Sequence, residues 1–137
     1  MHLHEPLGDG VVAGHGMLDG RRVVCFSQDF AVFSGTMGEM HARKICKILE
    51  LAEKGRLPVI GMWDGDGQRP HEGVTSLGPN GEILDRLVSC SGKVPILSIV
   101  LGTVSGTSAL AAGLSDFVIL GRQRGRMFMR SPYVIPE

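Results

Sequence analysis

Short apolar runs separated by glycine-rich stretches divide the chain into elements. Two of these runs, Val11 to Ala13 and Val23 to Phe26, stand on either side of the dipeptide Asp19-Gly20. An Asp-Gly pair between apolar segments favours a tight hairpin turn. The pattern therefore predicts two antiparallel strands, near residues 10–17 and 21–30.

A helical pattern follows the hairpin after a loop over residues 34–38. From Glu39 to Lys54, apolar residues recur at the spacing of one helix face, at Met40, Ile45, Ile48, Leu49 and Ala52. Glu39 would lie in the first turn, where an acidic side chain is favourable, and Gly55 would end the element. We therefore expect a helix over 39–54.

The remaining apolar runs alternate between the two kinds of element. Continuous runs bounded by glycine predict further strands, and segments of helical spacing or of small residues predict helices. The expected strands are 57–63, 95–101, 117–120 and 127–129, and the expected helices lie within 81–91 and 105–112. The order β-β-α-β-α-β-α-β-β indicates an α/β fold with largely parallel pairing.

Bulk properties limit the classes of function. The 137 residues suit a single domain over 1–137, and 14 basic residues balance 14 acidic ones, so nothing indicates a nucleic-acid surface. Three cysteines without CxxC spacing fit a reducing compartment. No apolar run is long enough to cross a membrane, and the N-terminus lacks a secretory layout. We expect a cytoplasmic protein that does not contact a membrane.

Glycine, at 20 residues, is the unusual component, and it gathers at the ends of apolar runs. The pattern of apolar strand, glycine-rich turn and helix occurs over 57–91 and again over 95–113. The two turns, 64–73 and 102–108, would each place free backbone N–H groups at the start of a helix. Such groups can stabilise an anion or a developing oxyanion. The sequence therefore predicts a site built from main-chain donors.

Other catalytic patterns do not occur. The chain contains no GxxxxGK[ST], GxGxxG, HExxH or GxSxG motif. None of the five histidines forms a pair with the i, i+4 spacing of a helical zinc site, so we expect no bound metal.

Several charged side chains in these segments allow two interpretations. His71 with Glu72 is interpreted either as a general acid or base or as the solvated start of a helix. Asp64 and Asp66 have the spacing of paired carboxylates, but aspartates in such turns more often bond to their own backbone. Four arginines near the C-terminus fit either an exposed turn or contact with a phosphate-rich ligand or a partner subunit: Arg122, Arg124, Arg126 and Arg130.

The turns and their surrounding strands resemble a known family, the carboxyltransferase subunits of propionyl-CoA and acetyl-CoA carboxylases. Related decarboxylases such as glutaconyl-CoA decarboxylase share the pattern. The resemblance covers nearly the whole chain, and the Phe-Ser-Gln-Asp-Phe sequence at 26–30 is specific. The matching segments are 8–16, 24–35, 41–48, 58–61, Arg69, 72–74 and 114–117.

The resemblance implies a crotonase-type (ClpP/crotonase) superhelix of ββα units that assembles into oligomers. Family members move CO2 between carboxybiotin and the α-carbon of an acyl-CoA, and backbone N–H groups stabilise the thioester enolate. The family's Asp-Ser-Gly-Gly-Ala-Arg loop falls on 64–69, and its Ala-Gly-Gly-Ala loop falls on 105–108. The resemblance thus assigns the donors to Gly67, Gln68, Gly106 and Thr107. The expected substrate-binding residues are Asp66, Arg69, His71, Glu72, Ser105 and Ser108.

Three departures from the family pattern matter. Asp66 replaces a glycine, and its negative charge would oppose an enolate. Thr107 replaces another glycine and adds a branched side chain. The chain is also much shorter than the family's subunit, and the half that supplies the biotin-side surface is not part of it.

These departures leave three functions open. The first is a carboxyltransferase-type domain that binds an acyl-CoA or acyl-carrier thioester. The second is a biotin-independent decarboxylase acting on a malonyl-type thioester. The third is a non-catalytic remnant that binds acyl-CoA or a partner. Coenzyme A thioester is the expected substrate, and biotin would arrive only through a partner chain. The expected partners are further copies of the chain, a complementary carboxyltransferase subunit or a biotin carrier.

Overall fold

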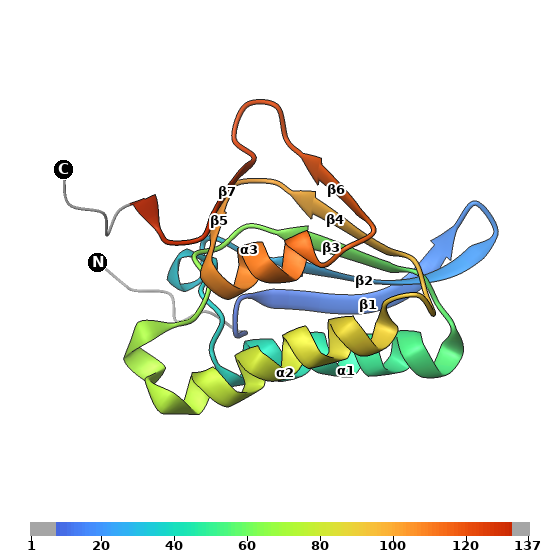
Figure 1. The fold of residues 1–137 in the computed structure, drawn as a ribbon, viewed down its shortest axis with the longest axis horizontal. Coiled ribbons are helices and arrows are strands. Elements are labelled where there is room, and N and C mark those ends of the chain that lie inside the picture. The colour runs from blue at the N-terminus through green and yellow to red at the C-terminus, as the bar shows by residue number, and fades with distance from the viewer. Residues whose placement is uncertain (1–7, 133–137) are drawn as a thin grey trace.

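The computed structural model describes residues 8–132, which form a five-stranded sheet covered by helices (Figure 1). The sheet has the strand order β1-β2-β3-β4-β6. Strands β1 (Val11–Leu18) and β2 (Arg21–Gln28) form the predicted antiparallel hairpin. Its turn residues Asp19 and Gly20 both have positive φ, as the favoured two-residue hairpin turn requires.

The other strands are parallel, as the alternating pattern predicted. Strand β3 (Val59–Trp63) pairs with β2, β4 (Ile96–Val100) pairs with β3, and β6 (Phe117–Leu120) pairs with β4. Each parallel step is made through a helix, so the carboxyl ends of these strands meet at one edge of the sheet. The two glycine-rich turns follow β3 and β4 at this edge.

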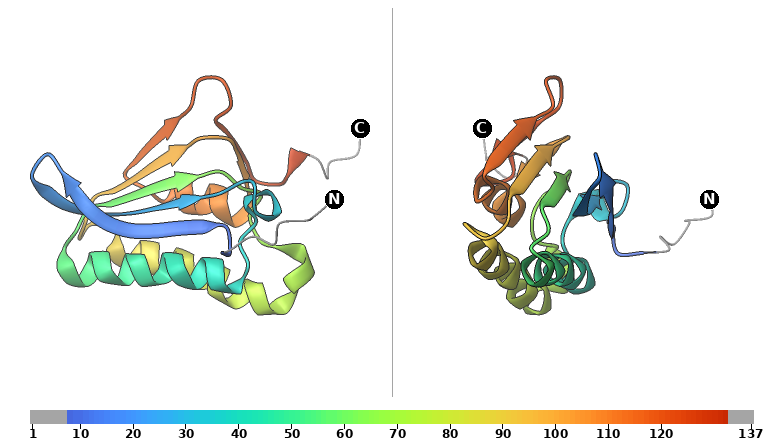
Figure 2. Two further views of the ribbon diagram at one scale, coloured as in Figure 1. Left: turned by 180° about the vertical axis from the view of Figure 1, so that it is seen from behind. Right: turned by 90° about the vertical axis from the view of Figure 1, so that its right-hand side faces the viewer.

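Helices α1 (Glu39–Gly55) and α2 (Val74–Cys90) lie side by side along one face of the sheet, and the views of Figure 2 agree with Figure 1. Of the apolar stripe that the spacing over 39–54 predicted, Ile45, Leu49 and Ala52 are fully buried. Ile48 is partly buried, and Met40 in the first turn is 58% exposed. The core beneath α1 includes Phe26, whose ring meets the Trp63 ring edge-on at 4.9 Å. The Trp63 indole N–H donates to Ser98 Oγ at 2.8 Å, which satisfies this buried donor.

Helix α2 begins well before the predicted span of 81–91 and contains Gly78, Pro79 and Gly81. These residues disfavour a helix, so the local pattern was misleading. Buried polar side chains stabilise the first turns instead. Asn80 Nδ2 donates to the Met37 carbonyl at 3.1 Å and to the Ser76 carbonyl at 2.7 Å. Tertiary hydrogen bonds therefore outweigh local propensity here.

The C-terminal part of the described chain adds a small second sheet. A short strand that was not predicted, β5 (Thr103–Ser105), comes directly before α3 (Gly106–Gly113) and pairs in parallel with β7 (Arg126–Phe128). Register places Thr103 opposite Arg126. This pairing holds the end of the β6–β7 loop at the carboxyl edge of the main sheet.

Strand β6 is the exposed edge of the main sheet. All four of its residues are apolar, and their exposed fractions are 68% for Phe117, 36% for Val118, 54% for Ile119 and 47% for Leu120. Parallel strands are usually buried on both faces. The exposure of β6 therefore marks an apolar sheet edge that nothing among residues 8–132 covers. Within residues 8–132, no helix has the length and apolar character that a membrane crossing requires.

Candidate functional site: two glycine turns at the carboxyl edge

The first turn, Asp64 to Gln68, is held against the loop that precedes α1. The two segments cross so closely at Gly35 and Gly65 that a Cβ on either glycine would overlap the backbone of the other segment. Three backbone hydrogen bonds connect the two segments: Asp66 N to Ser34 O at 3.4 Å, Met37 N to Gly67 O at 2.6 Å, and Arg69 N to Met37 O at 3.0 Å. The turn is therefore fixed along its length.

The second turn leads from β5 into α3. Ser105 is extended, with φ −141° and ψ 168°, and Gly106 has φ +55°, a conformation that favours glycine. Gly106 and Thr107 are the first two residues of α3, so their N–H groups have no acceptor within the helix.

The two turns meet. An added Cβ at Gly67, which has φ +74°, would lie 2.8 Å from the Ser105 carbonyl oxygen. The same point is 3.4 Å from Thr107 N and 3.5 Å from Gly106 Cα. The segments that the sequence singled out, far apart along the chain, are thus in contact through a position where only a hydrogen atom fits.

The N–H groups of the four residues assigned as donors, Gly67, Gln68, Gly106 and Thr107, are not used by the loop backbone. None of them donates in the backbone hydrogen bonds that residues 8–132 make outside helices and strands. Gln68 forms a parallel bridge with Met37, and in that pattern its neighbours make the bonds while its own N–H points away. The arrangement can therefore present main-chain donors to an anionic oxygen.

Asp66 lies in the first turn with both carboxylate oxygens engaged. Ser105 Oγ donates to Asp66 Oδ1 at 3.1 Å, and Ser131 Oγ donates to Asp66 Oδ2 at 3.2 Å. The carboxylate thereby connects the first turn to the residue before α3. Ser105 itself is 2% exposed. The Asp66 and Ser105 side chains therefore hold the two turns together.

Arg69 is 2% exposed and belongs to the frame of the first turn. Its Nη1 lies 2.6 Å from Asp9 Oδ1 and 2.7 Å from Glu72 Oε1, and its Nη2 donates to the Thr36 carbonyl at 2.9 Å. Glu72 Oε2 also accepts from the backbone N–H of Glu39, the first residue of α1, at 2.7 Å. Arg69 and Glu72 therefore connect the start of α1 to the turn.

The other residues named from the sequence have varied surroundings. His71 is exposed, and its ring lies 5.4 Å from the Phe33 ring. Gln68 Nε2 donates to the Gly73 carbonyl at 3.1 Å and to Ser76 Oγ at 2.9 Å, so the side chain is held against the start of α2. Ser108 is fully buried in α3, and its Oγ has no hydrogen-bond partner among residues 8–132.

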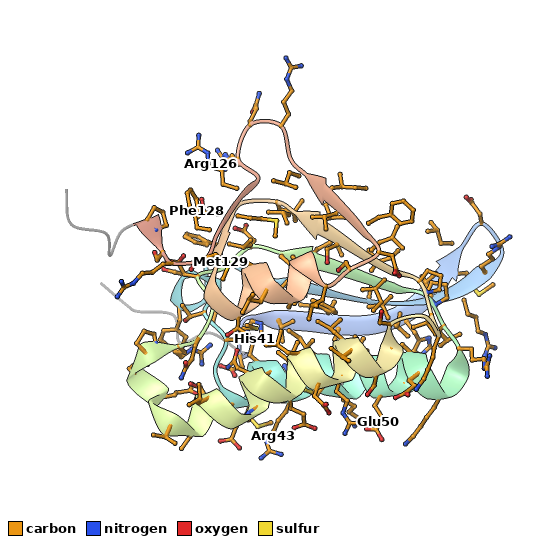
Figure 3. The ribbon with its side chains drawn as sticks, in the orientation of Figure 1. His41, Arg43, Glu50, Arg126, Phe128 and Met129 are labelled. Carbon is orange, nitrogen blue, oxygen red and sulfur yellow. The ribbon has the colours of Figure 1, made fainter. Side chains whose placement is uncertain are left out.

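A buried network of hydrogen bonds, which the sequence did not predict, holds the first residue of the first turn in place. Asp64 N donates to Gln28 Oε1 at 3.0 Å, and Gln28 Nε2 lies 3.3 Å from His41 Nε2. His41, labelled on α1 in Figure 3, has its Nδ1 2.8 Å from the Asp9 carbonyl oxygen. This network requires the neutral tautomer that donates from Nδ1 and accepts at Nε2. Both side chains belong to matched family segments, but no local signal marks them as neighbours of Asp64.

Burial lowers the pKa of His41 from its ordinary 6.5 to about 4, although the contacts with Asp9 act in the opposite direction. Burial likewise raises the pKa of Asp64, against the effect of Arg124 and with that of Asp29. Among the described residues, no three His, Cys, Asp or Glu side chains gather as metal ligands would.

The lowered pKa of His41 gives a pH-dependent stability. Because the folded pKa of about 4 is below the unfolded 6.5, the unfolded chain binds the proton more tightly. The contribution of His41 is complete above pH 6.5 and is lost as the pH falls towards 4. It amounts to about 3 kcal/mol, since one pKa unit corresponds to about 1.4 kcal/mol. Urea unfolding at several pH values should show a smaller decline for His41→Gln than for the wild type, and equal declines would contradict the prediction.

Comparison with known proteins gives the family. The sequence description of the carboxyl transferase domain matches residues 1–137. This chain belongs to the carboxyl transferase domain family. It is 42% identical to the propionyl-CoA carboxylase beta chain of Cereibacter sphaeroides over 98% of its own length and 26% of that protein. It is 46% identical to the biotin-dependent acetyl-/propionyl-coenzyme A carboxylase beta5 subunit of Mycobacterium tuberculosis, over 96% of this chain and 24% of that one.

Several solved structures share the fold. The chain superposes with a TM-score of 0.87 and 35% identity on transcarboxylase 12S, a hexamer solved with methylmalonyl-coenzyme A and methylmalonic acid, over 93% of this chain and 25% of that one. A Pseudomonas malonate decarboxylase hetero-tetramer in complex with malonate gives a TM-score of 0.87 at 28% identity, over 93% of this chain and 48% of that one. The expected crotonase-like α/β fold is thus confirmed. The chain spans about a quarter of the length of its curated relatives.

Proposed function

We propose that this chain is an acyl-CoA carboxyltransferase-type domain that stabilises a thioester enolate with backbone N–H groups. The main support for this proposal is the contact between the two glycine turns, at Gly67 and the Ser105–Thr107 backbone. An enolate forms when negative charge moves from the α-carbon onto the thioester oxygen. Donors fixed before that charge develops stabilise the transition state without rearranging, and one such donor is worth about 3 kcal/mol.

The donors would be the N–H groups of Gly67, Gln68, Gly106 and Thr107. The frame around them supports this assignment, because Arg69, Glu72 and the Gln28–His41 chain hold the first turn in place. Coenzyme A thioester is the proposed substrate. Carboxybiotin would be supplied by a partner chain, since the relatives include a biotin-dependent carboxylase subunit.

A second function, decarboxylation of a malonyl-type thioester without biotin, is favoured by the likeness to malonate decarboxylase at 28% identity. A third, non-catalytic binding of acyl-CoA or a partner, is favoured by the carboxylate of Asp66 close to the proposed donors. The negative charge of Asp66 would oppose an enolate, but hydrogen bonds from Ser105 and Ser131 stabilise that charge and weaken this argument against catalysis.

One experiment separates the three functions. The purified chain is incubated with malonyl-CoA, methylmalonyl-CoA or propionyl-CoA, with and without carboxybiotin, and the thioester products are measured. Carboxyl transfer that depends on carboxybiotin supports the main proposal. Release of CO2 without biotin supports the decarboxylase, and binding without turnover supports the third function. If no coenzyme A thioester binds, the two enzymatic proposals fail for the chain alone.

Self-association is the proposal that the exposed β6 edge supports. A net charge of zero gives no overall repulsion between copies, and the four apolar residues of β6 favour contact with another surface. Sedimentation should therefore give a mass above 14.7 kDa at micromolar concentrations. Ile119→Lys should reduce this association, whereas Leu18→Lys at the exposed hairpin tip should not. A wild-type chain that sediments as a clean monomer would contradict this prediction.

A further inference from the structure

A hydrogen-bond relay runs from the first residue of the first turn, Asp64, through Gln28 and His41 to Asp9. Asp64 N donates to Gln28 Oε1 at 3.0 Å, and Gln28 Nε2 lies 3.3 Å from His41 Nε2. His41 Nδ1 lies 2.8 Å from the Asp9 carbonyl oxygen. Gln28 is 4% exposed and His41 is 0% exposed, so solvent does not reach the two side chains in the middle of the relay.

The two ends of the relay fix its direction. At one end the Asp64 N–H can only donate, and at the other end the Asp9 carbonyl oxygen can only accept. Each group between them must therefore accept on the side of Asp64 and donate on the side of Asp9. This leaves one arrangement, in which Gln28 presents its oxygen to Asp64 and His41 carries its only ring proton on Nδ1.

A charged His41 is incompatible with this arrangement, because an imidazolium ion donates from both ring nitrogens. Its Nε2–H would face the NH2 group of Gln28. If the amide turned to offer its oxygen to His41, its NH2 group would face the N–H of Asp64 instead. Every charged state therefore contains two opposed buried donors. His41 lies on the buried face of α1, whereas Asp64 begins a turn, so Asp64 is the end of the relay that moves.

The surroundings of His41 keep its ring neutral at pH 7. Burial lowers the pKa of His41 to about 4, and the positive charges of Arg69 and Lys44 act in the same direction. Asp9 acts in the opposite direction. The Asp9 carboxylate already has other partners, because it lies 2.6 Å from Arg69 Nη1 and accepts from the His41 backbone N–H at 2.7 Å.

Asp64 is placed to pass a shift to both turns. Its carbonyl oxygen lies where a Cβ on Gly35 would be, and its carboxylate lies where a Cβ on Gly102 would be. Gly35 belongs to the segment that crosses the first turn, and Gly102 is the first residue of the second turn. Contacts this close leave no free space between the backbones, so a displaced Asp64 moves the segments that carry the proposed N–H donors.

We propose that Gln28 and His41 are positioning residues that tie the shape of the first turn to the charge of a histidine. While His41 is neutral, its Nε2 sets the orientation of the Gln28 amide, and that amide holds the Asp64 N–H. When His41 gains a proton, the amide loses this orientation and the two turns lose their alignment. The effect on turnover rests on the proposed function, whereas the effect on the Asp64 N–H does not.

Nuclear magnetic resonance tests the relay without a substrate. At pH 7 the ring nitrogen resonances of His41 should show a neutral imidazole protonated at Nδ1. Gln28→Met removes the acceptor of the Asp64 N–H, whose exchange with D2O should become about tenfold faster. Gln28→Glu offers an oxygen at both ends, so the Asp64 N–H should stay protected while His41 becomes charged at pH 7. His15→Gln is the control, since it removes an exposed imidazole on β1 and should change neither signal.

Exchange of the α-proton of acetyl-CoA for deuterium tests the link to turnover. Gln28→Met should lower kcat by about tenfold and change KM by less than about twofold, because the donors are misplaced rather than lost. Gln28→Glu should restore most of the kcat, since its carboxylate again accepts from the Asp64 N–H. A side chain that only fills space would give no such rescue. Circular dichroism establishes that each variant folds.

The outcomes separate the inference from the proposed function. A wild-type His41 that is charged at pH 7, or that carries its proton on Nε2, would overturn the inference. Unchanged exchange of the Asp64 N–H in folded Gln28→Met, or a neutral His41 in folded Gln28→Glu, would do the same. Wild-type kcat in Gln28→Met would overturn the link to turnover. If the relay behaves as expected but the folded wild type neither binds nor exchanges acetyl-CoA, the proposed function fails and the positioning of the turn stands.

Discussion

Replacing Gly67 by alanine is expected to slow enolate chemistry by about a hundredfold to a thousandfold, the effect of losing an oxyanion donor. The added methyl group would lie 2.8 Å from the Ser105 carbonyl oxygen, and a φ of +74° is unfavourable for alanine. The two turns would have to separate, and their N–H groups could no longer donate hydrogen bonds to the same thioester oxygen. Turnover of malonyl-CoA, or hydrogen–deuterium exchange at the α-carbon of acetyl-CoA, measures the change.

The matched control for this variant is Gly78→Ala. Gly78 lies in α2, and an added Cβ there would meet nothing within 4 Å. Alanine is favoured over glycine within a helix by about 1 kcal/mol, so this variant should keep full activity and be slightly more stable. Circular dichroism establishes that both variants fold. Wild-type turnover in folded Gly67→Ala would mean that the turns do not act as a pair.

Replacing Arg69 by methionine is expected to lower the free energy of unfolding by about 3 kcal/mol, near the lower end for breaking a buried ion pair. The Arg69 side chain is 3% exposed, and its loss would leave the Asp9 and Glu72 side chains, 23% and 29% exposed, without their partner. Glu72 also accepts from the start of α1, so that contact would weaken too. Chemical denaturation measures the change.

Arg43→Met is the control for this prediction, because it removes the same charge from a surface pair. Arg43 and Glu39 are 59% and 40% exposed, and such a pair contributes about 0.5 kcal/mol or less. The two variants should therefore differ several-fold in their loss of stability. Equal losses would mean that the buried position of Arg69 is not what makes its ion pairs matter.

Periodicity and turn chemistry predicted most of the fold, because the signals are local. The Asp19-Gly20 turn and the apolar stripe of α1 depend on residues a few positions apart. The start of α2 could not be predicted in this way. Its first turns contain Gly78 and Pro79 and depend on Asn80 and Ser76, whose partners include the distant Met37. Strand β5 was missed because three residues are too few for a period.

The site shows the same division. Glycine clusters at the ends of predicted strands identified both turns, since the carboxyl ends of parallel strands share one edge. The roles of individual side chains were beyond reach. The oxygens of Asp66, a proposed substrate-binding residue, accept from Ser105 and Ser131, and Ser131 is 65 residues away along the chain. The ion pair of Arg69, another proposed substrate-binding residue, with Asp9 spans 60 residues. Pairings of this length leave no local pattern.

The close crossing at Gly35 and Gly65 has a thermodynamic consequence. Because the first turn is already interlocked with the segment before α1, it has little conformational freedom left to lose when a ligand arrives. Ordering a free loop would cost about 1 kcal/mol or more per residue. Here that entropy is lost during folding, so the free energy of each hydrogen bond to a ligand is available for affinity rather than for shaping the loop.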